Sequence, residues 1–322
     1  MVQRKNSMDK IAVVLATYNG EKYLREQLDS IQRQTYPEIE VYIHDDGSTD
    51  GTLEIINEYV KNKQSKVKFS FVGQSTLRYP QCFISTLLSI PRADYYAFCD
   101  QDDVWFEDKI EKAVKAMKRF GNECKASLFY SAVDYYDSNL NYIRNARFVN
   151  KSLPLVGAYS LQSMLLGGEA MGMTFLFNNK VRDLMKRVSE NGKFDFKDTF
   201  IKIYCAACGI VIYSSKPCAK YRRHSAATTL KMNPAGKIQR AINMTKKIFL
   251  EKDGLESIQA SVDYVLKEHH DEIEEKNKAI INAFASPNSI IKKLKKVFWP
   301  KRFRLRLIDE LGYRVAFLMG RI

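Results

Sequence analysis

The sequence predicts an α/β fold in which a mostly parallel sheet is flanked by helices and followed by a C-terminal helical extension. Three observations predict it: short apolar runs alternate with amphipathic helical patterns, polar turns follow the apolar runs, and strand signals end near residue 230. With 322 residues, 45% of them apolar, the chain can form one large domain with an appendage. We expect a main domain over residues 1–230, a helical extension over 231–285 and a basic amphipathic tail over 286–322.

The first part of the chain alternates strand and helix signals. Residues 11–16 form an apolar run followed by the turn TYNG, and residues 39–43 form a second run followed by DDGSTDG. Helical spacing of apolar residues over 23–31 and 53–60 separates these runs from each other and from a third run at 67–72. This order predicts parallel strands, whose carboxyl ends share one edge of the sheet and place ligands there. Both polar turns lie at that edge.

The pattern continues with a further strand, residues 95–99, which ends in the acidic run Asp-Gln-Asp-Asp. We expect helices at 83–89, 109–120 and 198–208, and strands at 127–136, 174–178 and 210–213.

Cysteine usage and charge narrow the class of protein. The 6 cysteines show no disulfide-framework spacing, which favours a reduced, intracellular setting. Neither a signal peptide nor a run of 18 apolar residues is visible, so we expect no membrane span. The net charge is +14, and the tail from residue 286 holds 10 Lys/Arg against 2 Asp/Glu. A basic excess indicates an anionic partner, such as nucleic acid, an acidic substrate or a membrane surface.

The acidic run places Asp100, Asp102 and Asp103 within four residues. These carboxylates repel one another unless a cation lies among them, and oxygen ligands suit Mg²⁺ or Mn²⁺, which also bridges a diphosphate. The alternative is that Asp102 or Asp103 simply caps the following helix. A second acidic strand end, at Asp45 and Asp46, favours the metal–diphosphate interpretation.

The segments ATYNGEKYLREQLDSIQRQTYPEIEVYIHDDGSTDGT and FCDQDDVWFEDKI together resemble the inverting family 2 glycosyltransferases with the GT-A fold. The second segment resembles their DXD region, in the rhamnosyltransferase-like bacterial branch. The resemblance continues through LLGGEAMGMTFLF and GIVIYSSKPCAKYRRH, so it covers roughly residues 9–230.

The resemblance implies a nucleotide-sugar donor bound at the strand ends. Tyr18 would lie against the nucleobase and Asp46 would bond its polar edge. Asp100 would lie near the ribose or the metal ion, Asp102 would be the principal ligand of Mg²⁺ or Mn²⁺, and Asp103 would orient the site or the acceptor. The same resemblance assigns further donor contacts to Thr17, Asn19 and Asp45.

An inverting transfer also needs a base that takes the proton of the acceptor hydroxyl. In this branch the base is an Asp about eleven residues before a Gly, which implies Asp198. Asp195 is the alternative base. A purely structural role for Asp198 would be to cap the helix that begins there. Here a Lys replaces the family's His and a Thr its first Trp, so the substrate-facing wall departs from the family pattern and is weaker evidence for the identity of the sugar. The family's Arg-x-His matches Arg222 and His224, which would lie near the diphosphate.

Cys205 and Cys208 have redox or zinc spacing, but no second pair accompanies them and both fall on a predicted buried helix. Core packing is the expected role of both.

The tail carries Ile290, Ile291, Leu294, Val297 and Phe298 at helical spacing, with lysines on the other faces. This pattern is typical of a helix lying in the interface of an anionic membrane, and relatives with similar tails act on lipid-linked glycans at the cytoplasmic face. The alternative is a helix packed on the main domain with solvated lysines. No nucleic-acid motif accompanies the charge, so we expect no nucleic-acid partner.

The sequence therefore predicts a peripheral enzyme on the inner face of the cell membrane, which transfers a sugar to a glycan or lipid-linked glycan. dTDP-rhamnose is the leading donor, and a UDP-hexose or UDP-N-acetylhexosamine is the alternative. A nucleotidyltransferase would carry a glycine-rich basic loop after its first strand, which TYNGEKY is not. A non-catalytic glycan-binding or scaffold protein would be expected to lack the acids or the base, whereas all candidates are present.

Overall fold

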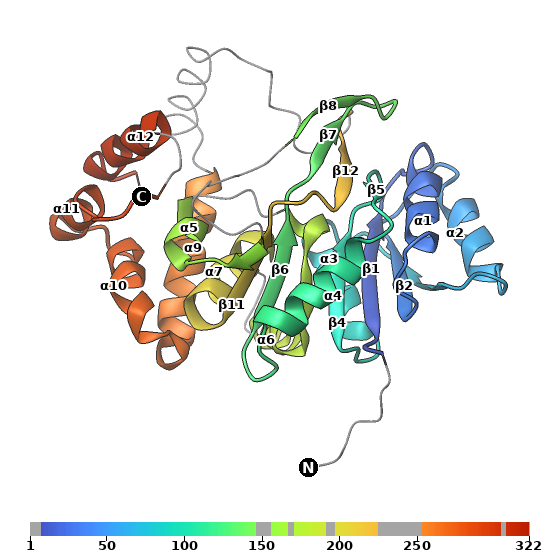
Figure 1. Cartoon of the computed structure of the whole chain (residues 1–322), viewed down its shortest axis with the longest axis horizontal. Helices are drawn as coiled ribbons and strands as arrows, with labels where there is room; N and C mark the ends of the chain where they lie inside the picture. Colours follow the sequence, from blue (N-terminus) through green and yellow to red (C-terminus); the bar gives the residue numbers. More distant parts are fainter. Residues whose placement is uncertain are drawn as a thin grey trace.

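The computed structural model describes residues 8–145, 156–166, 171–190, 197–224, 253–303 and 307–321. Its centre is an eight-stranded sheet in the order β3-β2-β1-β4-β10-β6-β11-β9 (Figure 1). The strands are β1 (Ile11–Thr17), β2 (Ile39–Asp45), β3 (Lys68–Gln74), β4 (Tyr95–Cys99), β6 (Ser127–Ser131), β9 (Val156–Ala158), β10 (Leu176–Asn178) and β11 (Ile210–Ser214).

Most neighbours in this sheet are parallel, as the sequence predicts. β1 pairs in parallel with β2 and β4, β2 with β3, and β6 with β11. β10 runs antiparallel between β4 and β6, and β9 is antiparallel to β11. The predicted α/β class with a mostly parallel sheet is confirmed.

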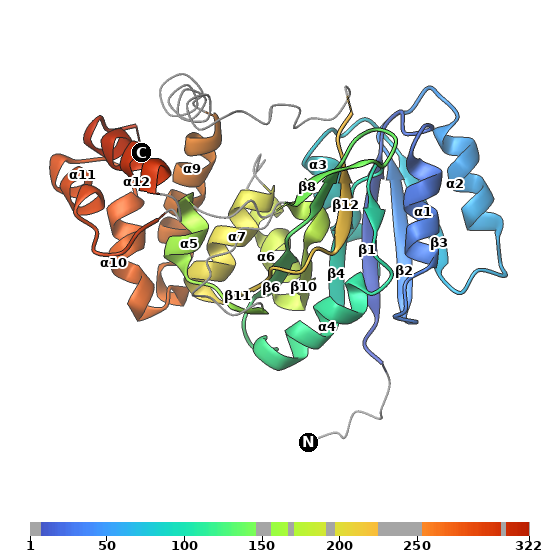
Figure 2. The ribbon, with the colours of Figure 1, turned by 45° about the horizontal axis from the view of Figure 1, so that its top comes forward.

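Helices cover both faces of this sheet (Figures 1 and 2). One face packs on α1 (Leu24–Gln32), α2 (Thr52–Lys61) and α4 (Lys109–Phe120), and the other on α3 (Gln81–Ser89), α6 (Asn179–Glu190) and α7 (Lys197–Cys208). Successive strand residues alternate between the faces, so Val13 belongs to the first core and Val14 to the second. Because both faces are buried, the strands read as continuous apolar runs.

A second sheet of four strands stands beside the carboxyl ends of the first, in the order β5-β12-β7-β8 (Figure 1). Its strands are β5 (Val104–Trp105), β7 (Asp134–Tyr136), β8 (Tyr142–Asn145) and β12 (Ala219–Arg222). The prediction of a single strand over 127–136 is wrong, because Ala132 bonds to Ser214 and Cys218 and the chain then leaves the large sheet to pair with β12.

The strand expected at 174–178 is shorter than predicted. β10 begins at Leu176, and Gly172–Thr174 forms a 3₁₀ turn, η1. The short helix α5 (Leu161–Leu166) lies between β9 and η1 in the chain and contributes Met164 and Leu165 to the second core.

The described part of the C-terminal region is helical, as expected. It contains α9 (Asp253–Glu268), the 3₁₀ turn η2 (His270–Glu272), α10 (Glu275–Phe284), α11 (Ile290–Val297) and α12 (Leu307–Leu318). α9 packs on α7, where the rings of Phe200 and Tyr264 meet edge to face at 5.4 Å. These helices extend the molecule beyond the β11–β9 edge (Figure 1). The rest of the predicted extension, residues 231–252, lies outside the described residues.

All 6 cysteines are free thiols, and Cys205 and Cys208 are buried in the core, which confirms their predicted packing role. Among the described residues, every helix is too short or too polar to cross a membrane.

Candidate active site

The carboxyl ends of β2, β1 and β4 lie side by side and bring the predicted donor-binding residues together. Thr17 pairs with Asp45 in the register of β1 and β2, and the Asp46 N–H donates to the Thr17 carbonyl at 2.7 Å. β4 ends beside β1 and leads into Asp100. Residues 83 positions apart along the chain thus share one edge of the sheet.

Asp45 is fully buried and organises the loop that follows β2. One carboxylate oxygen accepts from the hydroxyls of Thr17 and Ser48, and the other from the backbone N–H groups of Gly47 and Ser48 and from Gln74 Nε2 at 3.0 Å. Gly47 has a φ of +90°, which an L side chain rarely adopts. Asp45 therefore shapes the loop, and its oxygens are engaged within the protein.

The TYNG turn is locked against this loop and against the β4 end. The Asn19 N–H donates to Ser48 Oγ at 2.9 Å, and Asn19 Oδ1 accepts from the Thr49 N–H at 2.8 Å. Gln101 exchanges two hydrogen bonds of 2.8 Å with the Tyr18 backbone. With its backbone held, the Tyr18 ring is 58% exposed at the sheet edge, where a flat ligand can stack on it.

Asp46 holds the loop between β3 and α3. Its carboxylate accepts from the backbone N–H of Leu77 at 2.6 Å and from that of Arg78 at 2.9 and 3.0 Å. His44 Nε2 lies 3.9 Å from the same carboxylate. The loop that carries Tyr79 is therefore tied to the predicted nucleobase residue.

The acidic run divides into an inward and an outward carboxylate. Asp103 is fully buried, and its Oδ1 accepts the Arg222 N–H at 2.9 Å. Its Oδ2 has no hydrogen-bond partner within the described residues. Burial, reinforced by the charges of Asp102 and Asp100, raises the pKa of Asp103 well above its usual range. Neither Asp102 nor Asp103 caps α4, whose N-cap position is Asp108.

Asp102 faces outward and forms a pair with His224. The Asp102 side chain is 23% exposed, and its Oδ2 lies 2.8 Å from His224 Nε2. The His224 ring rests 4.8 Å from the ring of Tyr23, centre to centre. A carboxylate beside an imidazole suits Mn²⁺, and the orphaned oxygen of Asp103 lies in the same run. The described residues contain no group of three or more metal-binding side chains.

Arg222, the other half of the Arg-x-His match, is 2% exposed and bonds within the protein. Its guanidinium donates to the carbonyls of Asp102 and Ser138, both at 2.8 Å, and to the carboxylate of Glu26. It also lies 4.5 Å over the ring of Tyr23. Arg222 thereby ties the acidic run, the β7–β8 turn and α1 together, whereas the sequence analysis expects it near the diphosphate.

Asp198 lies in the first turn of α7 and is fixed by a glycine. Its Oδ2 accepts the Gly172 N–H at 2.9 Å. A Cβ at Gly172 would lie 2.5 and 2.6 Å from the two carboxylate oxygens, so only glycine allows this approach. The alternative base, Asp195, lies outside the described residues.

Tyr79 was not predicted as a site residue. Desolvation of its hydroxyl raises the pKa of Tyr79, with further contributions from the charges of Asp198 and Asp100. One hydroxyl is thus within electrostatic reach of the predicted base and of the acidic run. No sequence signal marks Tyr79, because it belongs to a loop without periodicity.

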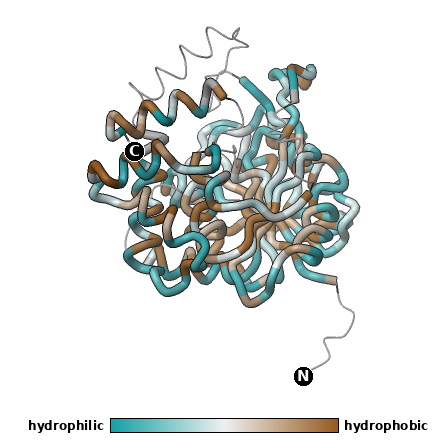
Figure 3. The backbone as a smooth tube through the Cα atoms, turned by 60° about the vertical axis from the view of Figure 1, so that its left-hand side comes forward, coloured by the Kyte–Doolittle hydropathy of each residue, from teal (hydrophilic) through white to brown (hydrophobic). Residues whose placement is uncertain are grey.

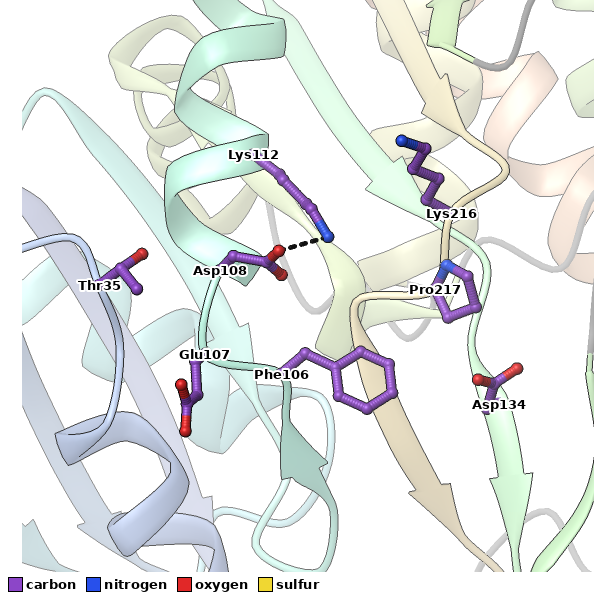
Figure 4. Close-up of a pocket in the computed structure, with 8 residues that line it drawn as sticks. All are labelled: Thr35, Phe106, Glu107, Asp108, Lys112, Asp134, Lys216 and Pro217. Atoms are coloured by element: carbon purple, nitrogen blue, oxygen red, sulfur yellow. Dashed lines mark ion pairs between the residues drawn. The ribbon is translucent and has the colours of Figure 1, made fainter.

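A separate cavity of about 760 Å³ lies beside the β5–α4 segment (Figure 4). Within it, Lys112 pairs with Asp108 at 2.5 Å. None of its lining residues is a candidate site residue; they are Thr35, Phe106, Glu107, Asp108, Lys112, Asp134, Lys216 and Pro217.

A parallel sheet with an acidic run beyond its fourth strand and a partly antiparallel second half defines a protein of the GT-A class. The family description "Glycosyl transferase family 2" matches residues 12–178, which is 167 of the 322 residues. The chain therefore belongs to glycosyl transferase family 2, which confirms the family and the kind of enzyme predicted from the sequence.

Two curated relatives illustrate the similarity. The dTDP-rhamnosyl transferase RfbG of Shigella flexneri is 34% identical over 131 residues, covering 38% of this chain and 43% of RfbG. The Escherichia coli enzyme WfaP, a UDP-Glc:α-D-GlcNAc-diphosphoundecaprenol β-1,3-glucosyltransferase, is 30% identical over 130 residues, covering 40% of this chain and 47% of WfaP. The matches thus span less than half the length of these relatives.

Among solved structures, S. aureus TarS 1–349 in complex with UDP-GlcNAc superposes with a TM-score of 0.53 at 16% identity. The superposition covers 97% of this chain and 91% of that one. At this identity the similarity shows the fold, including the helices that follow the sheet.

Proposed function

We propose that the chain catalyses the inverting transfer of a sugar from a nucleoside diphosphate to a glycan hydroxyl. The observation that carries the proposal is that the carboxyl ends of β1, β2 and β4 bring Tyr18, Asp46 and the acidic run with its Asp102–His224 pair to one edge of the sheet. A displacement reaction also needs a base on the side of the reacting carbon opposite the leaving group, and we assign that role to Asp198.

On the donor side, Tyr18 stacks on the nucleobase and Asp46 accepts its N–H. Thr17, Asn19 and Asp45 hold the two turns that frame this position, as their mutual hydrogen bonds support. Asp100, which directly follows β4, would contact the ribose or the metal ion. A pyrimidine base, which offers an N–H beside carbonyl oxygens, fits one stacking ring and one carboxylate.

On the leaving-group side, Asp102 and His224 would hold Mn²⁺ or Mg²⁺. The metal ion, when bound, neutralises the charge of the departing nucleoside diphosphate. Asp103 and Arg222 would support Asp102 without contacting the donor. Asp103 accepts the Arg222 N–H, and the Arg222 guanidinium donates to the Asp102 carbonyl. His224, which is paired with Asp102, presents an imidazole to the same diphosphate.

On the acceptor side, Asp198 takes the proton of the attacking hydroxyl. The Gly172 N–H fixes one of its oxygens through a hydrogen bond of 2.9 Å. A general base held in place by a backbone N–H contributes by orientation as well as by proton transfer.

For the donor we propose dTDP-rhamnose first and a UDP-hexose or UDP-N-acetylhexosamine second. RfbG is named as a dTDP-rhamnosyl transferase, whereas WfaP uses UDP-Glc and TarS was solved with UDP-GlcNAc. For the acceptor we propose a lipid-linked glycan of a bacterial surface polysaccharide, such as capsule, wall polysaccharide or O-antigen. WfaP, whose name specifies a diphosphoundecaprenol acceptor, supports this choice.

We further propose that residues 286–322 attach the enzyme to the anionic inner face of the cell membrane. The large apolar residues exposed on and beside α11 and α12 support this proposal, and those of α11 stand between lysines (Figure 3). These residues are Ile290, Ile291, Leu294, Phe298, Leu307, Leu311, Val315, Leu318 and Met319.

The test is donor consumption by the purified chain across a panel of nucleotide sugars, with Mn²⁺, with Mg²⁺ and with a chelator. We expect one donor to be consumed only with metal, and Asp102→Ala and Asp198→Ala to abolish consumption. Asp183→Ala is a matched control, because Asp183 is an exposed carboxylate paired with Arg92 at 2.9 Å. Failure of every nucleotide sugar to bind would instead support a non-catalytic glycan-binding or scaffold role on the same fold.

A further inference from the structure

Lys109 is a buried lysine between the two halves of the candidate active site. It is the first residue of α4, and only 1% of its surface is exposed. Its ammonium lies 3.4 Å from the centre of the Trp105 ring. Because burying a charge is unfavourable unless partners compensate it, the contacts of this ammonium show what it does.

On one side the ammonium packs on the ring of Trp105, which stands two residues after Asp103. Burial lowers the pKa of Lys109, while Cys218 and Cys99, and after them the charges of Asp103 and Asp100, oppose that shift. Asp103 is the carboxylate whose Oδ2 has no hydrogen-bond partner in the described part of the chain. Lys109 is thus enclosed next to the segment that follows the acidic run, in a position that solvent does not reach.

On the other side the ammonium holds η1. Lys109 Nζ donates to the carbonyl oxygen of Met173. The preceding residue, Gly172, donates its N–H to Asp198 Oδ2 at 2.9 Å and leaves no room for a Cβ beside that carboxylate. A displacement of η1 would therefore move or release the Asp198 side chain.

We propose that Lys109 is a positioning residue that fixes Asp198 relative to the acidic run, with one buried ammonium that packs on Trp105, two residues after Asp103, and donates to the Met173 carbonyl. The inference rests on the proposed function, since it assigns Lys109 to the same reaction. Lys109 itself does not contact donor or acceptor, because its side chain is enclosed by Trp105 and η1.

The alternative is that Lys109 only supports the fold. The two roles differ in what they change: a positioning role lowers kcat and leaves nucleotide affinity intact, whereas a general loss of structure lowers both together. They also differ in where the backbone loosens. A positioning role exposes the Gly172 amide to exchange while β1 amides such as that of Val13 stay protected.

The test compares Lys109→Met with the control Lys112→Met, which removes an exposed lysine of the same helix that pairs with Asp108. The probe is whichever nucleotide sugar the wild-type chain consumes with Mn²⁺, and the matching nucleoside diphosphate for affinity. For Lys109→Met we expect kcat to fall by about 10–100-fold, nucleotide Kd to change by less than about threefold, and Gly172 exchange to rise about tenfold. For Lys112→Met we expect wild-type values.

Unchanged kcat in a folded Lys109→Met variant overturns the inference and leaves the proposed function standing. Parallel loss of kcat, nucleotide affinity and β1 protection also overturns it, in favour of a purely structural role. If Lys109→Met does not fold, Lys109→Gln retains a donor for the Met173 carbonyl and is measured in the same way. Absence of donor consumption by the wild-type chain overturns the proposed function itself, and is recognised before any variant is made.

Discussion

The strand-end site and the α11–α12 pair place polar and apolar side chains in opposite ways. At the strand ends, buried polar groups meet partners, as Asp45 meets Thr17 and Ser48. In α11 and directly after it, large apolar side chains are exposed, Ile290 by 74% and Phe298 by 76%, while Lys296 is buried at 1% exposure. The first region fits the proposed binding of a small polar ligand, and the second fits the proposed attachment to an apolar surface.

The inward lysine is what separates α11 from an ordinary packed helix. Lys296 Nζ donates to Asn288 Oδ1 at 3.0 Å and lies over the rings of Phe284 and Phe317 at 5.3 and 5.7 Å. α12 supports the arrangement, because Arg314 donates to the carbonyls of Lys296 and Trp299 at the end of α11, both at 3.0 Å. A helix stabilised mainly by core burial would place Ile290 and Phe298 inside instead.

Buried charged side chains have different surroundings in the two regions. At the strand ends, desolvated charges are held by many partners, which fixes geometry for chemistry. At α11, a desolvated lysine accompanies exposed apolar area, which leaves a surface for a partner. Each use is testable by exchanging the side chain that defines it.

The largest expected effect comes from Asp198→Asn, which removes the base and keeps the shape of the side chain. Turnover of the consumed nucleotide sugar should fall by about 10³-fold, because general base catalysis contributes roughly that much. Nucleotide affinity, measured by calorimetry, should stay within about twofold. Asp183→Asn is the control, and retention of turnover by Asp198→Asn would exclude Asp198 as the base.

Lys296→Met should stabilise the fold at neutral pH. Burial, with the neighbouring charges of Lys292 and Lys293, lowers the pKa of Lys296 to about 8 from its ordinary 10.5. Below pH 8 both folded and unfolded chains carry this proton, so the full burial penalty of roughly 3 kcal/mol is present. Between about pH 8 and 10.5 the unfolded chain binds more protons, so wild-type stability rises with pH.

Denaturant unfolding across this range is the measurement. The gain of Lys296→Met over wild type should be greatest below pH 8 and shrink towards pH 10. Lys295→Met, at an exposed lysine of the same helix, should show no such slope. A gain independent of pH would show that the charge of Lys296 is not what the substitution removes.

The double variant Ile290→Ser and Phe298→Ser should weaken membrane binding. Loss of two large apolar contacts should reduce partitioning onto phosphatidylglycerol-containing vesicles by about 30-fold in a sedimentation assay. Val72→Ser removes a 39% exposed apolar side chain from β3 and should bind like wild type. If wild type bound neutral vesicles equally well, the proposed preference for an anionic membrane surface would be contradicted. If the double variant instead changed from an oligomer to a monomer, the exposed apolar side chains would serve self-association rather than membrane binding.

The smallest effect is expected for Gln101→Ala, which removes the two bonds that hold the Tyr18 backbone. The donor KM should rise about fivefold with kcat unchanged, because ordinary hydrogen bonds contribute about 1 kcal/mol each. Initial-rate kinetics at saturating metal would show this. A lower kcat with unchanged KM would place Gln101 nearer to the chemistry than to the nucleobase.

The sequence predicted the large sheet well, because its strands are buried on both faces and carry long apolar runs, as in β1 and β2. It missed β5, β8 and β12 of the small sheet, because strands of two to four residues show no periodicity. The strand predicted over 127–136 failed for a related reason: Ala132 and Val133 are apolar and continue the run, but the backbone turns there to bond with the 214–218 segment.

The candidate site was likewise predicted only in part. Spacing predicted which residues would gather at the strand ends, but not which way each side chain points. Asp102 and Asp103 are adjacent, yet one faces outward to His224 and the other is buried against Arg222, because β5 begins immediately after them. For α11 the pattern identified an apolar face, and only the packing of Lys296 and Arg314 shows that this face is turned outward.

The central claim is tested most directly by a crystal structure of the chain with Mn²⁺ and the nucleoside diphosphate of the consumed donor. The account predicts an anomalous manganese peak at Asp102 and His224, with the base on Tyr18 and the diphosphate on the metal ion. Manganese or nucleotide bound elsewhere, for example in the cavity lined by Phe106 and Pro217, would contradict it.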